Sequence, residues 1–177
     1  MIAEKLRKAV LQAAIQGKLT EQLPEDGDAR DLLKEIQQEK ARLVKEGKLK
    51  KEKPLPEITE DESPFDIPEN WVWVRLGEIV SVKGGKRIPL GKRLTKIKTN
   101  HKYIRVADMQ NGTVLDTDIH YVPDDVYPMI EKYTISVNDI YITVAGTIGR
   151  VGTIPKEFDL ANLTENADKL VFNFLEK

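Results

Sequence analysis

Apolar residues near the N-terminus recur at the spacing of a helix. Ile2, Leu6 and Val10 are four residues apart, and this period predicts one apolar face on a helix over residues 2–16. Gly17 is expected to end the helix, because glycine readily takes the left-handed conformation found after helix C-termini.

A second apolar stripe predicts a helix over residues 29–46. Asp28 precedes it as an N-cap, since an aspartate side chain accepts amide protons of the first turn, and Gly47 follows its end. The stripe consists of Leu32, Leu33, Ile36, Leu43 and Val44. Both stripes are narrow, so the two helices need a further surface to pack against.

Residues 48–67 are predicted to be a linker. Pro54, Pro56 and Pro64 stand among charged residues there, and proline blocks a helix and stiffens an extended path. A β-rich domain is predicted from residue 68 to residue 177. The fold class is therefore α+β, with an N-terminal helical segment over residues 1–47 followed by a mixed, β-rich domain.

Short strands are expected within that domain, because β-branched and aromatic residues cluster between turn signals. The predicted strands cover residues 71–76 with a continuation to 82, 103–106, 114–122, 139–144 and 150–154. Turns are predicted at residues 111–112 and 145–149, where glycine occurs. A short helix is predicted over residues 126–132.

The distribution of charge adds a candidate binding surface. The chain of 177 residues has a net charge of −1 and no cysteine, which excludes disulfides and thiolate metal sites. Residues 83–105 nevertheless hold nine basic and no acidic side chains, and such a stretch can bind a polyanion. No apolar run is long enough for a membrane helix and no signal peptide is visible, so a cytoplasmic protein is expected.

We call residues 83–105 the basic ribbon. Lysine and arginine neutralise DNA phosphates and release counterions, and Gly84, Gly85 and Gly91 can let the backbone approach a phosphate closely. Arg87 or Arg93 can pair with guanine and Asn100 with adenine. The alternative is a solvated, flexible loop. The candidate DNA-binding residues are Lys83, Lys86, Arg87, Lys92, Arg93, Lys96, Lys98, Asn100, Lys102 and Arg105.

Two glycine-containing segments offer further candidates. Gln110 and Asn111 can contact bases, although an Asn-Gly turn is the simpler interpretation. In residues 143–150, backbone amides near glycine can bind an anion, with Thr147 and Arg150 as side-chain donors. The alternative is a tight bend in which glycine only relieves steric conflict.

Several segments resemble the specificity subunits of type I restriction-modification systems, in order along nearly the whole chain. Residues 6–19, LRKAVLQAAIQGKL, resemble the conserved helical segment of that family. Residues 67–78, IPENWVWVRLGE, resemble the entry to a target-recognition domain. DIYIT at 139–143 and GTIG at 146–149 resemble a strand and turn inside that domain.

The resemblance implies a cytoplasmic complex in which this protein binds one half of a split double-stranded DNA target. Modification and restriction subunits would be its partners and would carry the methylation and cleavage chemistry. Typical members have two recognition domains, whereas this chain holds one, so we expect an N-terminal portion with a truncated domain that can form a homodimer. The N-terminal helices would lie between halves or subunits, or alternatively would cover the recognition domain.

No catalytic, metal or cofactor site is predicted. His101 and His120 lack metal-ligand spacing, residues 84–86 lack the spacing of a phosphate-binding loop, and no carboxylates are paired by their spacing. One alternative function is an interaction adaptor whose basic ribbon meets an acidic protein surface. The other is an unrecognised nuclease or methyltransferase, which incubation with DNA, magnesium and S-adenosylmethionine would reveal.

Overall fold

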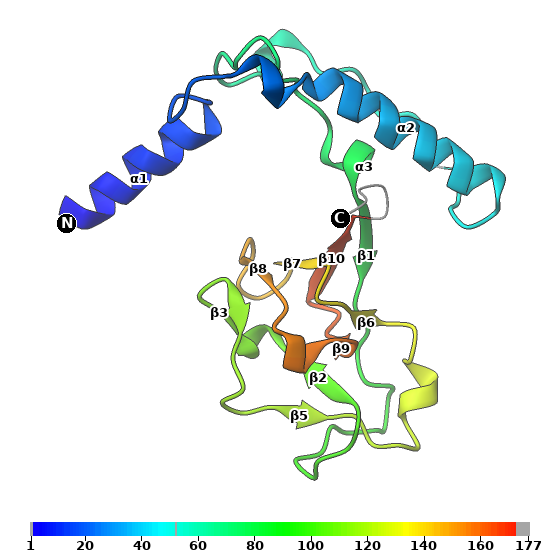
Figure 1. Ribbon diagram of the computed structural model, residues 1–177. Coiled ribbons are helices and arrows are strands. Elements are labelled where there is room, and N and C mark those ends of the chain that lie inside the picture. The colour runs from blue at the N-terminus through cyan, green and yellow to red at the C-terminus, as the bar shows by residue number, and fades with distance from the viewer. Residues whose placement is uncertain (1, 52, 173–177) are drawn as a thin grey trace. The chain divides into compact units, whose positions relative to one another are not determined.

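The computed structural model describes residues 2–51 and 53–172, and it has the predicted α+β composition (Figure 1). The chain divides into two compact units between Ile79 and Val80. The first unit holds the α-helices and the second holds the strands. In the described ranges, no helix is long and apolar enough to cross a membrane. The last five residues of the predicted domain, 173–177, lie outside the described residues.

The first unit contains both predicted helices. Its helices are α1 (Ile2–Ile15), α2 (Ala29–Lys45) and α3 (Leu76–Ile79), with 3-10 turns at Pro24–Asp26 and Glu60–Glu62. Asp28 caps α2 as predicted, because its Oδ1 accepts the Arg30 amide at 2.7 Å. Gly17 and Gly47 follow the two helices with φ of 66° and 72°, the left-handed conformation that ends helices.

The predicted strand over residues 71–76 is wrong. The segment is fixed by side-chain contacts instead of a strand ladder, since the Trp71 indole donates to Gln22 at 2.9 Å. Glu78 accepts the Arg75 amide at 2.8 Å, which caps the short helix α3 where the strand was expected to continue. The aromatic and β-branched residues of segment 71–76 therefore pack within the first unit and do not form a strand.

The predicted linker region folds back onto Arg75. The guanidinium of Arg75 donates to both carboxylate oxygens of Glu62 at 2.7 Å. It also donates to the backbone oxygens of Pro56 at 3.1 Å and Glu57 at 3.0 Å. One arginine thus contacts the linker region at residues 56, 57 and 62.

Acid is expected to release this attachment. Arg75 and the Thr59 amide lower the pKa of Glu62 from 4.5 to about 2. A carboxyl whose pKa is lower in the folded state stabilises that state above the unfolded pKa, and the stabilisation is lost as the pH falls from 4.5 towards about 2. An NMR titration of Glu62 should therefore have its midpoint near the lower value. In Arg75→Gln the midpoint should move up towards 4.5, and an unmoved midpoint would contradict the assignment.

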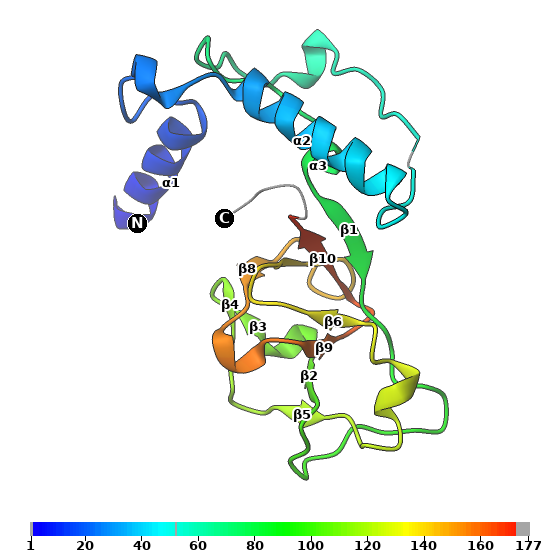
Figure 2. The ribbon, with the colours of Figure 1, turned by 45° about the vertical axis from the view of Figure 1, so that its right-hand side comes forward.

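The second unit consists of short strands in three sheets (Figures 1 and 2). The strands are β1 (Ser81–Gly84), β2 (Lys102–Ile104), β3 (Met109–Gln110), β4 (Thr113–Val114), β5 (His120–Tyr121), β6 (Thr134–Ile135), β7 (Ile140–Thr143), β8 (Val151–Thr153), β9 (Ala161–Leu163) and β10 (Ala167–Val171). One sheet has the antiparallel order β1-β10-β7-β8, and a mixed sheet has the order β5-β2-β9-β6 with β2 and β9 parallel. The third is the hairpin β3-β4. Three 3-10 turns, at Val106–Asp108, Tyr127–Met129 and Lys156–Phe158, connect them.

The predicted strands at 103–106, 139–144 and 150–154 are confirmed as β2, β7 and β8 with shifted ends. Residues 114–122 form two short strands instead of one. The predicted helix over 126–132 is wrong, because only one 3-10 turn forms there. Beyond this turn, the Ile130 carbonyl accepts the Tyr133 amide at 3.0 Å and the side-chain amide of Asn162 at 2.8 Å. Neither β9 nor β10 was predicted.

Two apolar clusters support the second unit. The larger packs Tyr141, Phe158, Ile104, Met109 and other buried side chains between the sheets. The smaller consists of Tyr103, Val122, Val126 and Ile130, and partly buried Ile88, Leu94 and Tyr127 pack against it. Because Ile88 and Leu94 belong to the basic ribbon, the ribbon is attached to a core.

Candidate nucleic-acid interface

The basic ribbon is held along its length by backbone and side-chain hydrogen bonds. Thr95 and Tyr121 exchange two backbone bonds of 2.9 Å, and the Tyr103 hydroxyl donates to the Lys86 carbonyl at 2.8 Å. Burial raises the pKa of Tyr103 to about 12, so the hydroxyl remains a donor at neutral pH. These bonds favour an ordered surface over the flexible loop that was the alternative.

Gly85 approaches the protein's own backbone. The Gly85 amide donates to Ala167 at 3.1 Å, and the next amide, of Lys86, donates to Leu163 at 2.8 Å. A Cβ atom on Gly85 would lie 2.0 Å from the Thr164 carbonyl oxygen. We predicted that a phosphate could come close to the backbone at Gly85. The turn between β9 and β10 already fills that space.

The basic ribbon is free of acids in sequence but not in space. Carboxylates from other segments reach five of its nine cations: Arg105 and the cations of the pairs Arg87–Glu165 (2.6 Å), Lys92–Asp125 (2.7 Å), Lys96–Asp118 and Lys102–Asp116 (3.9 Å). Exposed ion pairs of this kind contribute at most about 1 kcal/mol, so a phosphate can displace them. Each carboxylate still reduces the positive potential, which corrects the picture of an unopposed basic surface.

Arg105 is a structural residue of the second unit. Its guanidinium makes a bidentate contact with Asp108 at 2.7 and 3.1 Å and also donates to the Asp118 carbonyl at 2.7 Å. The Asp108 side chain is 2% exposed and that of Arg105 is 26% exposed. These contacts engage the Nε and Nη2 donors of Arg105 within the protein.

The remaining cations of the ribbon are exposed and available. Across the described residues, no ion pair involves Lys83, Lys86, Arg93 or Lys98. The Lys86 ammonium lies 5.5 Å from the centre of the Tyr133 ring. Asn100 is exposed and lines a small pocket with Lys98, but Glu157 and Asp159 line the same pocket.

A second group of polar side chains lies around the hairpin β3-β4. Its two-residue turn has positive φ at Asn111 (55°) and Gly112 (74°), which confirms the predicted Asn-Gly turn and is typical of a type I′ hairpin. The Gly112 carbonyl accepts the Thr153 amide at 3.0 Å. A Cβ on Gly152 would lie 2.4 Å from the Gly112 backbone, so glycine is needed where β8 passes the turn.

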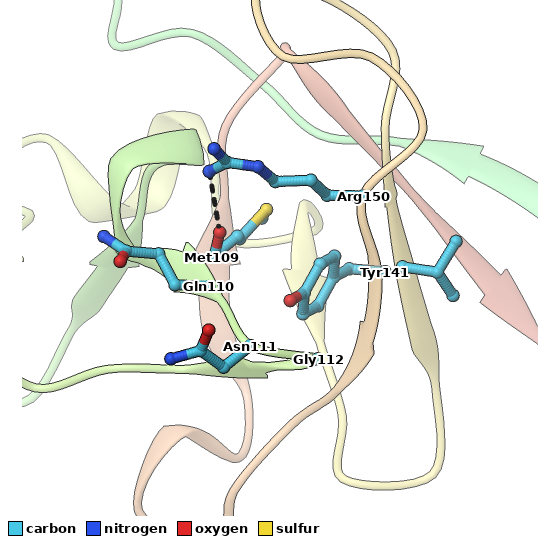
Figure 3. Close-up of a pocket in the computed structure, with 7 residues that line it drawn as sticks. Met109, Gln110, Asn111, Gly112, Tyr141 and Arg150 are labelled. Carbon is cyan, nitrogen blue, oxygen red and sulfur yellow. Dashed lines mark hydrogen bonds between the residues drawn. The ribbon is translucent and has the colours of Figure 1, made fainter. Parts of the chain in front are cut away.

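Figure 3 shows a pocket of about 250 Å³ beside this turn. Arg150 donates to the Met109 carbonyl at 3.1 Å, and the Gln110 amide donates to Ala107 at 2.8 Å. The buried Tyr141 hydroxyl faces the middle of the pocket and donates to Thr113 at 2.9 Å. The lining residues are Met109, Gln110, Asn111, Gly112, Tyr141, Arg150 and Val151.

The bend over residues 143–150 satisfies most of its own amides. Gly149 donates to the Thr143 carbonyl at 2.8 Å, and Arg150 donates to the Thr143 hydroxyl at 2.9 Å. The amides of Val144 and Ala145 both donate to Asn166. These bonds favour the tight-bend interpretation over an anion site, and they leave Thr147 as an exposed residue of the bend.

The predicted residues therefore separate into two groups. Arg150 lies with Gln110 and Asn111 around one pocket, whereas the basic ribbon leads from the end of β1 through the loop at the lower end of the second unit to β2 in Figures 1 and 2. Tyr141 was missed as a pocket residue. Its only signal was its place in the predicted buried strand over 139–144, which suggests a core residue.

Comparison with known proteins agrees with the resemblance seen in the sequence. The profile of the type I restriction modification DNA specificity domain matches residues 68–169. The specificity subunit of the type I restriction enzyme EcoAI of Escherichia coli is 41% identical over 147 residues, which are 83% of this chain and 24% of that protein. The EcoEI specificity subunit of Escherichia coli is 36% identical over 148 residues, 83% of this chain and 25% of that protein.

The chain thus spans about a quarter of the length of these curated relatives. A solved structure, the HsdS subunit from Thermoanaerobacter tengcongensis, aligns with 98% of this chain and 38% of its own, with 20% identity and a TM-score of 0.47. The domain profile covers more than half of the chain, and the EcoAI relative is 41% identical over 83% of it. The chain belongs to the family of type I restriction-modification DNA specificity proteins.

Proposed function

We propose that this chain is the part of a type I specificity subunit that binds one half of a split DNA target. The relatives are named as specificity subunits of type I restriction enzymes, and the sequence predicts a binding protein. The observation that carries the proposal is the core-anchored basic ribbon, in which Arg93 and Lys98 are exposed and make no ion pair with any described residue. Methylation and cleavage would be carried out in the cytoplasm by the modification and restriction subunits.

The basic ribbon would act first, by electrostatic attraction of the DNA backbone. Lysine and arginine at phosphates provide affinity that does not depend on sequence, and this affinity decreases with salt. Base edges are then read by a smaller number of polar side chains held in register by the phosphate contacts. An ordered ribbon favours this sequence of events, because less conformational entropy is lost on binding.

The helical segment would dock the partner subunits. The apolar stripe of α1 is largely exposed, with Ile2 at 86% and Leu6 at 63%. Exposed apolar surface of this kind marks protein interaction sites in soluble proteins. We therefore expect α1 to pack against a modification subunit or against another helix of the specificity subunit.

Removing the two free cations is expected to weaken DNA binding. The double variant Arg93→Gln/Lys98→Gln should bind all duplexes less tightly and reduce the salt slope by about two, since each phosphate contact contributes about 0.9. The measurement is a fluorescence-anisotropy titration of labelled duplex DNA over a series of salt concentrations, with the modification subunit present.

Lys132→Gln/Lys156→Gln is the matched control, because it removes the same charge from exposed lysines of the same unit. Equal effects of the two double variants would mean that only net charge matters, and the ribbon would lose its assigned role. Competition by heparin with no preference for duplex DNA would favour the adaptor function instead.

A further inference from the structure

We propose that Gln110, Asn111 and Arg150 form a site that reads purine edges in a groove of the DNA target. The three side chains lie on the same side of the Tyr141 ring in Figure 3, with Arg150 above Gln110 and Asn111 below. They come from the hairpin β3-β4 and from the residue before β8. The inference rests on the DNA-binding function proposed above and assigns part of its sequence specificity.

The site is held rigidly before any ligand arrives. The turn at Asn111 and Gly112 is fixed to β8 by the bond from Thr153. Glycine at position 152 allows the two backbones to come this close. Pre-organised polar groups lose little entropy on binding, and specific contacts need such positioning.

The free hydrogen-bonding groups match the edges of purines. Arg150 has five N–H donors, of which one bond, to Met109, is made within the protein. The side-chain amide of Gln110 donates one hydrogen bond to the Ala107 carbonyl. The Asn111 side chain is exposed and makes no hydrogen bond within the described residues. Arginine pairs with O6 and N7 of guanine, and asparagine or glutamine pairs with N6 and N7 of adenine.

The absence of carboxylates distinguishes this pocket from the other surfaces. None of its lining residues is acidic, and within the described ranges no ion pair involves Arg150. The pocket beside Asn100 contains Glu157 and Asp159, which repel phosphates. Arg150 therefore presents its charge to an approaching polyanion without competition from the protein.

The decisive variant is Asn111→Gly. Glycine tolerates the positive φ of this position, so the substitution removes the amide while the turn is kept. The protein, with the modification subunit present, is used to select binders from a library of duplex DNA with random sequence. We expect the variant to lose discrimination by about tenfold at one or two adjacent positions of the selected motif. Arg150→Gln should act at a neighbouring position, and Thr117→Gly, an exposed turn residue outside the pocket, should change nothing.

The outcomes separate this inference from the proposed function. A parent motif that reappears unchanged in Asn111→Gly and Arg150→Gln would overturn the base-reading site and leave DNA recognition standing. Selection of no motif by the parent protein would overturn both. Equal loss of binding to every sequence would assign the pocket to phosphate contact and would likewise overturn base reading.

Discussion

Replacement of Gly85 by alanine is expected to destabilise the second unit by about 3 kcal/mol, at the upper end of overpacking effects. The new Cβ would lie 2.0 Å from the Thr164 carbonyl oxygen and 2.5 Å from that of Leu163. Both are backbone atoms of the turn between β9 and β10, so no side-chain rotation can relieve the clash. The bonds that attach the ribbon to this turn, at Gly85 and Lys86, would be lost. Urea unfolding followed by circular dichroism gives the free energy of unfolding.

Gly84→Ala is the control, because its Cβ would meet only Asp168 at an ordinary distance of 3.4 Å. It should change the free energy of unfolding by about 0.5 kcal/mol or less. If Gly85→Ala kept full stability and lost DNA affinity, the glycine would serve phosphate contact and the structural role would be wrong.

Arg105→Ala is expected to cost about 3 kcal/mol or more of stability, the effect of removing one partner of a buried ion pair. The variant leaves the carboxylate of Asp108, which is 2% exposed, without its bidentate partner. The backbone amide of residue 105 would still donate to Asp108 at 2.8 Å. This bond would not neutralise the charge of the carboxylate. The midpoint of urea unfolding is the measurement.

The double variant Arg105→Ala/Asp108→Asn should recover part of the lost stability, because it leaves no unpaired charge at the buried position 108. Arg93→Ala, an exposed cation with no ion pair among the described residues, serves as the surface control and should have little effect. If Arg105→Ala unfolds at the same urea concentration as the parent but binds DNA poorly, the structural role is wrong and Arg105 contacts DNA.

The helical elements could be predicted well because their signals are local. The stripe and cap of α2 depend on residues within one segment, and so did the strand at β7 and the turn at Asn111. The strand over 71–76 failed because its aromatic residues pack on distant partners such as Gln22. The strand β10 contains Asp168 and Lys169, and only its place between two other strands makes it a central strand.

The candidate site was predicted less well than the fold. Spacing along the chain located the cations of the basic ribbon, but most of the carboxylates that pair with them come from residues 116–125 and from Glu165. Such pairs depend on the fold and leave no local signal. The pocket at Arg150 likewise depends on the contact between β8 and the hairpin turn, which joins residues about forty positions apart in the sequence.

The pairing of the first strand of the second unit with its last has an evolutionary consequence. Ser81 lies opposite Val171, so the polypeptide enters and leaves the recognition body at neighbouring points. A body of different sequence that keeps this one antiparallel pair can replace it by recombination, without moving whatever precedes or follows. Under the proposed function, new target preferences would be acquired by exchange of the second unit, while the helices of the first unit are inherited unchanged.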